Sequence, residues 1–515
     1  MSERHGRVMR GLETAGHDPT FQGRFGRLFP DLPAATFGAT EAAEHENLCK
    51  LAGAMVSGFD VPKDAPDDEE SGIPALYTYL GQFIDHDLTF DPTASFQKQK
   101  DPSAKTDFRS PAFDLDNIYG RGPGDQPYLY DANGKSFVFG DPITQGKPPG
   151  ARDLQRNNAG RALIGDPRND ENAIVSQLQG LFLHFHNRVV TQHPHMGFEE
   201  VQKVVRHHYQ YVVLNDFLSR IVKASVLDEL KTNNLFDQTK LKFFRDLKNP
   251  FMPVEFSVAG YRLGHSMVRP GYRLNDTVLL PIFPLPVDET KGTISFPEGL
   301  TGFRRLISDW ALDWGRFVDI DVRPYGAPEE SATPAQKVQN FSRLQFAYRI
   351  DTALVDPLKN LPPSVANNPP ASLALRNLLR AREFGLPSGQ TVAEAMGASV
   401  LDDKDIKIGQ GVDHPDSPLK NIVEVAGSAF AGNCPLWTYI LAEAMNNQVP
   451  VSIPVEEAKQ ITTPQLGPVG GRIVAEVFVG LMFADPGSYL NQQPTWAPAD
   501  GPRYSLKDIV AFALG

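Results

Sequence analysis

The chain has 515 residues, of which 41% are hydrophobic and 22% charged, and its formal net charge is -12. This composition is typical of a globular protein with a large core, and the acidic balance with scattered Lys and Arg disfavours nucleic acid as a partner. The two cysteines, Cys49 and Cys434, exclude a disulfide framework and a four-thiolate metal site. No run approaches the roughly 20 apolar residues of a membrane span, and no export signal opens the chain. We therefore expect a soluble chain that is cytoplasmic or non-classically secreted.

The first 40 residues are rich in Pro and Gly and predict an arm that either wraps over the surface or is partly disordered. Helical periodicity predicts helices, in chain order, over residues 73–88, 171–193, 198–227, 302–314, 370–385, 434–445 and 470–485. In residues 128–139, Asn133-Gly134 separates two short β-prone runs and predicts a tight hairpin. The expected fold is mainly α with very little β-structure.

The segment LGQFIDHDLTFDP, residues 80–92, crowds three carboxylates around one histidine in a predicted apolar helix. On a helix, Gln82 and His86 share one ridge, whereas Asp85 and Asp87 lie about 100° to either side of His86. A metal ion bound by Asp85, His86 and Asp87 together would need the helix to break. Either these side chains have local, solvated roles, or each has a separate partner. The apolar surroundings favour separate partners.

Residues 110–120, SPAFDLDNIYG, offer a partner for Asp87. In an extended chain every second residue lies on the same side, which here holds Ser110, Ala112, Asp114 and Asp116. With Asp87 they provide a hydroxyl, a backbone carbonyl and three carboxylates, an oxygen-rich set typical of a Ca²⁺ site. The alternative is an Asx-rich turn that binds no metal.

The two segments together, GQFIDHDLTF followed by SPAFDLDNIYG, resemble the animal-type haem peroxidases of the peroxidase-cyclooxygenase superfamily. The family's pattern continues in order from about Tyr79 to Tyr489. The resemblance implies a large single-domain haem peroxidase helical fold over residues 41–515, preceded by an N-terminal arm of residues 1–40. It also implies haem b and calcium as cofactors.

Carried over position by position, the resemblance implies which residues lie on the distal side of the haem. His86 is then the general base that moves a proton between the peroxide oxygens, and an ordinary histidine pKa near 6.5 suits that role. Gln82 holds water or halide, and Arg168 in GDPRNDEN stabilises developing negative charge. Asp85 and Glu171 match positions that form ester bonds to haem, which would remove their charges. The alternative for Arg168 and Glu171 is an exposed ion pair.

On the proximal side, the resemblance implies His265 in VAGYRLGHSMVRP, on a helix, as the haem iron ligand. Asn377 in LRNLLRAREFGLP matches the acceptor that holds the second ring N–H. Arg262 and Arg380 match cations near the haem propionates. The late segment LGPVGGRIVAEVFVGLM matches a family helix that packs beneath the haem pocket.

Three features depart from the mammalian pattern. Asn172 stands where myeloperoxidase has a methionine bonded to haem, which implies a lower haem potential and weaker chloride oxidation, as in lactoperoxidase-like and bacterial members. Residues 383–384 are Glu-Phe in place of Asp-His. Arg262, three residues before His265, replaces the radical-forming tyrosine of the cyclooxygenase-like branch, and Tyr261 points about 100° away.

The resemblance therefore implies a haem peroxidase that uses hydrogen peroxide, through a ferryl intermediate, to oxidise bromide, iodide, thiocyanate or phenolic donors. Two alternatives are a haem-dependent fatty-acid dioxygenase and a haem-free calcium-binding protein that retains the fold. The implied partners are peroxide and small anionic or aromatic donors, with no nucleic acid and no membrane span.

Six other histidines lack a compact zinc-ligand spacing: His184, His186, His193, His195, His207 and His208.

Overall fold

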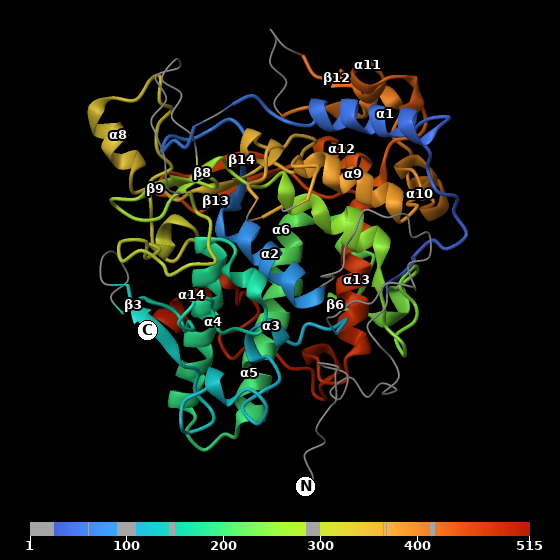
Figure 1. The fold of residues 1–515 in the computed structure, drawn as a ribbon. Helices are drawn as coiled ribbons and strands as arrows, with labels where there is room; N and C mark the ends of the chain where they lie inside the picture. Colours follow the sequence, from blue (N-terminus) through green and yellow to red (C-terminus); the bar gives the residue numbers. More distant parts are fainter. Residues whose placement is uncertain are drawn as a thin grey trace.

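Helices form most of the regular structure, as Figure 1 shows for a computed structural model of the chain. The structure describes residues 25–59, 61–89, 110–143, 150–284, 299–363, 365–366, 368–411 and 418–515. In these ranges the α-helices are α1 (Glu41–Ala54), α2 (Leu76–Leu88), α3 (Asp116–Tyr119), α4 (Ala173–Gln192), α5 (Phe198–Val212), α6 (Leu218–Ile221), α7 (Ala224–Asp228), α8 (Pro334–Asn340), α9 (Leu373–Glu383), α10 (Gly389–Met396), α11 (Ile422–Ala426), α12 (Leu436–Asn446), α13 (Gly470–Ala484) and α14 (Leu506–Leu514). The mainly α fold is confirmed.

Most of the predicted helices form close to the predicted residues, namely α2, α4, α9, α12 and α13. The predicted helix over residues 198–227 is divided into α5, α6 and α7 by the π-helical turn η4 (Val213–Phe217) and by extended backbone at Val222. The π-helical turn directs Asp216 inward, where its carboxylate accepts hydrogen bonds from the Tyr77 hydroxyl (2.6 Å) and from the Leu506 backbone N–H of α14 (2.8 Å). A tertiary contact therefore interrupts a continuous helical pattern.

Strands occur as two-stranded pairs throughout the described ranges. The pairs are β1 (Phe25–Gly26) with β7 (Met252–Pro253), β2 (Glu70–Pro74) with β10 (Phe346–Tyr348), β3 (Phe139–Pro142) with β4 (Arg152–Leu154), β5 (Lys231–Thr232) with β6 (Leu235–Phe236), β8 (Gly271–Arg273) with β9 (Leu279–Pro281), β11 (Lys407–Ile408) with β12 (Lys420–Asn421), and β13 (Gln448–Ile453) with β14 (Lys459–Pro464). The β1–β7 pair is parallel and the others are antiparallel.

The hairpin predicted over residues 128–139 is reduced to a tight turn. Tyr130 and Phe137 form a single antiparallel bridge, and Gly134 takes a φ of +66°, a left-handed conformation that glycine adopts without strain. The strand that follows the turn, β3, pairs with β4 instead. The longest hairpin, β13–β14, lies at residues that the sequence pattern did not single out.

Residues 302–314, which the sequence predicts as a helix, form an irregular segment with a 3-10 turn at its end. Backbone N–H groups of this segment donate to other segments: Gly302 to the Glu171 carbonyl (2.9 Å) and Leu312, whose N–H a helix would use internally, to Gln177 Oε1 (2.9 Å). The large apolar side chains in the second half of the segment are still buried. The helix prediction is wrong because burial satisfies the apolar pattern without helical geometry.

Helix α2 lies in the middle of the molecule, with α4 on one side of it and α13 on the other (Figure 1). Phe83 of α2 stacks on Phe182 of α4 with ring centroids 4.8 Å apart. Helix α13 is buried along almost its whole length, and its Phe478 packs against Tyr261 at 5.3 Å, just before His265 in the chain. None of the helices in the described ranges has the length and apolar character that crossing a bilayer requires.

Part of the predicted N-terminal arm contributes to the main hydrophobic core. Phe25, Phe29 and Phe37 are buried in it, and the Leu28 backbone N–H donates to a Glu255 carboxylate oxygen at 3.0 Å. The first 24 residues of the predicted arm lie outside the described residues.

The fold is expected to lose stability in mild acid through His186 of α4. Its Nε2 lies 2.8 Å from the Lys135 carbonyl oxygen, its Nδ1 lies 3.1 Å from the Tyr119 hydroxyl, and burial lowers its pKa to about 4. A histidine in the unfolded chain has a pKa near 6.5, so this contribution is complete above pH 6.5 and declines as the pH falls toward 4.

The variant His186→Gln retains one donor and one acceptor but does not titrate. Between pH 7 and pH 5, the wild-type chain should lose about 2 kcal/mol more unfolding free energy than this variant, measured by urea titration. The exposed His195→Gln is the control and should follow the wild type. Parallel pH profiles for the wild type and His186→Gln would contradict the assignment.

Candidate active site

Helix α2 presents the predicted site residues on different faces without breaking. All of its residues are buried except Gly81, Gln82 and Asp85, which form a partly accessible strip because Gly81 and Gln82 lie one turn before Asp85. His86 is 4% exposed, and Asp87 is fully buried. Gln82, Asp85, His86 and Asp87 therefore have different surroundings, although they lie within six residues of one another.

The ring of His86 contacts two residues of the segment before α4. Its Nδ1 lies 2.6 Å from Asn169 Oδ1, and its Nε2 lies 3.5 Å from a carboxylate oxygen of Glu171. Burial, and then the positive charge of Arg168, lowers the pKa of His86 to about 4. The expectation of an ordinary pKa near 6.5 is wrong, because the ring is withdrawn from water beside a cation. The imidazole is neutral at neutral pH.

Arg168 is fixed against the end of α2. It belongs to the 3-10 helix η3 (Pro167–Asp170), and buried Asp166 accepts hydrogen bonds from its backbone N–H (2.8 Å) and from its Nη2 (2.8 Å). The same Nη2 donates to the carbonyl oxygens of His86 (3.1 Å) and Thr89 (2.5 Å). These carbonyls form the negative end of the α2 dipole. The cation therefore has one orientation next to His86.

Glu171 meets the same ridge of α2. Gln82 Nε2 donates to Glu171 Oε1 at 2.5 Å, so the ridge of Gln82 and His86 faces one carboxyl group. Burial raises the pKa of Glu171 to about 7, although Arg168 and Gln82 oppose the shift. The next residue, Asn172, accepts the Ile174 N–H (2.8 Å) and thereby caps the N-terminus of α4.

His265 lies at the end of the 3-10 helix η7 (Gly260–His265), which follows the π-helical turn η6 (Glu255–Ala259). Its Nδ1 is 2.8 Å from Asn377 Nδ2 of α9. Reversing this side-chain amide, whose oxygen and nitrogen have the same shape, would turn the oxygen toward the ring, so that Nδ1 donates and the lone pair stays on Nε2, as in a metal-ligating histidine. Burial and the charge of Arg262 lower the pKa of His265 to about 3, so this ring is also neutral.

Arg262 links the two sides of the candidate site. Its Nη1 lies 3.6 Å from Asp85 Oδ2, and its Nε donates to the Ser257 carbonyl at 2.8 Å. Arg380 lies one turn after Asn377 on α9 and pairs with Glu383 at 3.6 Å. The structure thus joins α2, η3, η7 and α9 through contacts between predicted residues, while Arg380 lies at the margin of this group.

Asp87 turns away from His86 toward the 110–120 segment. Ligand oxygens of Asp87, Asp114 and Asp116 all lie within 4.8 Å of one another, and each side chain is at most 4% exposed. Leu115 has a left-handed φ of 59°, so the chain turns between the two acids instead of staying extended. The structure brings the three predicted carboxylates together by a turn, where the sequence suggested alternation.

Ser110, another predicted oxygen donor, contacts this cluster. Ser110 Oγ donates to Asp114 Oδ2 at 2.6 Å, and the Ser110 carbonyl accepts the Ala112 N–H at 2.8 Å. The Tyr209 hydroxyl of α5 donates to Asp87 Oδ2 at 3.1 Å. Burial raises the pKa of Asp114, with Arg206 opposing the shift. Three buried like charges need a compensating cation.

Several other histidines have local partners. The His184 ring stacks on Phe139 at a centroid distance of 4.1 Å, and ring nitrogens of His207 and His208 lie 3.0 Å and 2.8 Å from the carbonyl oxygens of Gly487 and Val204, respectively. Burial lowers the pKa of both His184 and His207 to about 4. These contacts give each of the three side chains a local packing partner.

Sequence reasoning missed polar residues that contact the site: Asp166, Asn169, Gln179 and Tyr209. Asp166 has a recognisable signal, since an acid before a proline marks a helix start. Gln179 interrupts an apolar run of α4, which marks a buried polar side chain but does not name its partner. Nothing in the local pattern connects Asn169 to His86.

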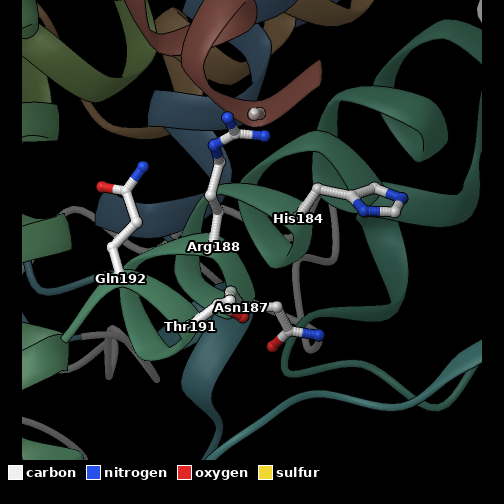
Figure 2. A pocket seen from close by; sticks show the side chains of 6 residues that line it. His184, Asn187, Arg188, Thr191 and Gln192 are labelled. Atoms are coloured by element: carbon white, nitrogen blue, oxygen red, sulfur yellow. The ribbon is translucent and has the colours of Figure 1, made fainter. Parts of the chain in front are cut away.

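A surface cavity of about 450 Å³ lies on α4, away from this site. Its lining residues are His184, Asn187, Arg188, Thr191, Gln192 and Ala513. Figure 2 shows the side chains of Arg188 and Gln192 extending to the same side of α4. None of these lining residues is among those that contact the His86 ring.

Comparison with known sequences gives a family match within the described fold. Residues 96–282 match the family model of the animal haem peroxidase. The chain is 24% identical over 245 residues to dual oxidase from Drosophila melanogaster and 26% identical over 243 residues to a peroxidase-like protein from Margaritifera margaritifera. These matches cover 46% and 43% of this chain but 13% and 26% of the relatives, so the chain spans about a quarter or less of their lengths.

Solved structures share the fold. Peroxidase A from Dictyostelium discoideum aligns with a TM-score of 0.55 and 14% identity, covering 99% of this chain and 98% of that one. Fatty acid alpha-dioxygenase from Oryza sativa aligns with a TM-score of 0.55 and 16% identity, covering 96% and 79%. The matched range includes the 110–120 segment, Arg168, Glu171 and His265, whereas α2 and α9 lie outside it. Residues 96–282 are thus similar to the animal haem peroxidase family, and the fold of the chain is that of helical peroxidase and dioxygenase structures.

Proposed function

We propose that the chain is a haem peroxidase that reduces hydrogen peroxide and oxidises bromide, iodide, thiocyanate or phenolic donors. The observation that carries the proposal is the position of a neutral His86 beside a fixed cation, Arg168. A base and a positive charge at one place are what cleavage of a peroxide bond requires. The contact between Arg262 and Asp85 links that place to His265, the proposed axial ligand.

The residues present fit a haem group. Gln82 and Asp85 on α2, together with Arg262 and His265 opposite, are partly accessible although their neighbours in the chain are mostly buried. His265, supported by Asn377, would hold the iron, and Arg262 and Arg380 would pair with the propionates. When bound, haem supplies an iron centre that accepts peroxide and takes up and releases electrons.

The chain's own residues would manage the proton and the charge. His86 Nε2 takes the proton from one peroxide oxygen and returns it to the other. With its pKa held near 4, His86 returns the proton readily, so it does not remain as a trapped imidazolium. Arg168 stabilises the negative charge that develops on the departing oxygen, and its bonds to Asp166 and Thr89 keep it from reorienting.

The proposal is tested by supplying haem to the purified chain and recording its absorption spectrum before and after peroxide is added. A Soret band that peroxide shifts, and that iodide, thiocyanate or a phenol restores, is the expected result. A chain that folds but takes up no haem would contradict the enzyme proposal and favour a calcium-binding protein. A donor survey with bromide, iodide, thiocyanate and phenols identifies the preferred reductant.

A fatty-acid dioxygenase is the second candidate, because a dioxygenase and a peroxidase align with this chain at the same TM-score. Against a dioxygenase, Arg262 occupies the position three residues before His265, where the cyclooxygenase-like branch has its radical-forming tyrosine. Tyr261 packs between Phe256 (4.9 Å) and Phe478 (5.3 Å). Oxygen uptake with palmitic acid, in the absence of another donor, would favour the dioxygenase.

Covalent attachment of haem through Asp85 and Glu171 is expected after exposure to peroxide. Burial favours an uncharged Glu171, and an ester is uncharged. After peroxide treatment, acidified-solvent extraction should leave haem on the protein, and Asp85→Asn with Glu171→Gln should release it. Complete release of haem from the wild-type chain would remove the ester proposal.

We propose that calcium occupies the Asp87, Asp114 and Asp116 cluster. Replacing Asp87 with Asn should reduce bound calcium, measured by atomic absorption, and lower the unfolding free energy by about 3–5 kcal/mol, because the remaining buried carboxylates lose their compensating cation. Asp402→Asn, at an exposed position, serves as the control and should change neither quantity. Equal calcium content in both variants would sink the assignment.

A further inference from the structure

The proton arrangement on His86 is set by a chain of buried amides that nothing in the proposed peroxidase chemistry assigns. From α2 it runs through Asn169 of η3 and Gln179 of α4 to the backbone carbonyl of Asn117 in α3. His86 Nδ1 lies 2.6 Å from Asn169 Oδ1, Asn169 Nδ2 is 2.8 Å from Gln179 Oε1, and Gln179 Nε2 is 3.3 Å from the Asn117 carbonyl oxygen. Asn169, Gln179 and Asn117 are fully buried, so water does not compete for these bonds.

The last member of this chain gives it one direction. A backbone carbonyl oxygen only accepts hydrogen bonds, so Gln179 must turn its NH₂ group toward Asn117 and its oxygen toward Asn169. Asn169 must then donate with its NH₂ group to Gln179 and turn its own oxygen toward His86. An oxygen at that place requires Nδ1 of His86 to carry the proton. Reversing either amide would set two acceptors against each other in a dry interior.

The Asn117 carbonyl is itself held by a second donor. It accepts the backbone N–H of Asp166 at 3.1 Å, and the Asn117 side chain donates to the Phe83 carbonyl of α2 at 3.2 Å. Gly165 allows this close approach, because a Cβ there would overlap the carbonyl oxygens of Asp116 and Asn117. The acceptor that orients the amides is therefore held by backbone contacts on both sides of the site.

We propose that Asn169, oriented by Gln179, is a positioning residue that holds His86 in the tautomer with the proton on Nδ1 and the lone pair on Nε2. The inference rests on the proposed function, in which Nε2 accepts the peroxide proton. With the proton on Nε2, that nitrogen would be a donor and could not act as the base. The amide of Gln179 on α4, which reaches His86 only through Asn169, thus decides whether the His86 ring on α2 is ready to react.

The test is nitrogen NMR of the full chain with ¹⁵N-labelled histidine rings, because ring-nitrogen shifts distinguish the two tautomers. The protein is measured as purified, or as the diamagnetic ferrous–carbonyl form if it carries haem, so the result does not depend on peroxidase activity. In the wild type, Nδ1 of His86 should carry the proton. Asn169→Leu should populate the Nε2–H tautomer, whereas Asn169→Asp, which still offers an acceptor, should retain Nδ1–H.

Gln179→Met should also shift the tautomer population, because Asn169 is then free to reverse. The matched control is Gln177→Met on the same helix, whose amide bonds to Ala173, Trp310 and Leu312 instead. If haem is bound, Asn169→Leu should slow the peroxide reaction by about 10²-fold and Asn169→Asp should recover most of the rate.

A wild-type His86 with its proton on Nε2 would overturn the proposal, as would an unchanged tautomer in a folded Asn169→Leu or Gln179→Met chain. If Asn169→Leu does not fold, Gln179→Met and Asn169→Asp decide the question. A correct tautomer in a chain without peroxidase activity would contradict the proposed function alone.

Discussion

Replacing His86 with leucine is expected to slow the reaction of the haem-loaded chain with hydrogen peroxide by about 10²- to 10⁴-fold, the usual contribution of a positioned acid–base group. Leucine fills the space but cannot take a proton from peroxide. Haem binding should persist, because the proposed iron ligand is His265. Stopped-flow absorption measures the rate, and an unchanged Soret band confirms that haem is in place.

The control is His184→Leu, which removes a half-buried histidine that stacks on Phe139 of β3. It should leave the peroxide rate unchanged. His86→Leu also leaves Asn169 Oδ1 without its donor, at an expected cost of about 1–3 kcal/mol in unfolding free energy. The rate must therefore be measured where both variants are fully folded. Equal rates in His86→Leu and the wild type would exclude His86 as the base.

A large stability effect is expected at Glu70 of β2, which lies between two buried arginines. Its carboxylate accepts from Arg269 Nη1 at 2.6 Å, and from Arg343 Nη1 and Nη2 at 2.7 Å and 2.6 Å. All three side chains are at most 2% exposed. Glu70→Gln keeps the shape but removes the carboxylate that the two buried arginines share, and only the more distant charge of Asp67 still acts on Arg269. The unfolding free energy should fall by about 3–5 kcal/mol in urea titration.

Loss of the Glu70 carboxylate should also affect the candidate site, because Arg269 lies four residues after His265 in the chain. The Nη1 of Arg269 also donates to the Phe346 carbonyl oxygen at 3.0 Å. Haem affinity should therefore fall together with stability. The control is Glu46→Gln, which breaks an exposed pair with Lys50 at 2.8 Å and should leave unfolding unchanged, since water screens such pairs. Similar results for Glu46 and Glu70 would show that burial of the triad contributes nothing.

Local pattern was sufficient for most of the predicted helices, although it missed α1 and α14, which also bury one face. The helices α2, α4, α9, α12 and α13 form near the predicted residues because their apolar periodicity extends over three or more turns. The same criterion failed for residues 302–314, whose N–H groups bond to neighbouring segments. Apolar periodicity indicates which residues are buried, whereas the neighbouring segments decide which partners the backbone N–H and C=O groups bond to.

The sequence by itself determined the residue types of the candidate site. It also determined their faces, because on any helix the spacing in residues 80–92 separates Gln82 and His86 from Asp85 and Asp87. Tertiary structure alone decided what each one meets. The low pKa of His86 comes from burial and from a cation 82 positions later in the chain. The direction of its Nδ1 proton depends on a carbonyl in α3, reached through two amides, because hydrogen bonds form between neighbours in space.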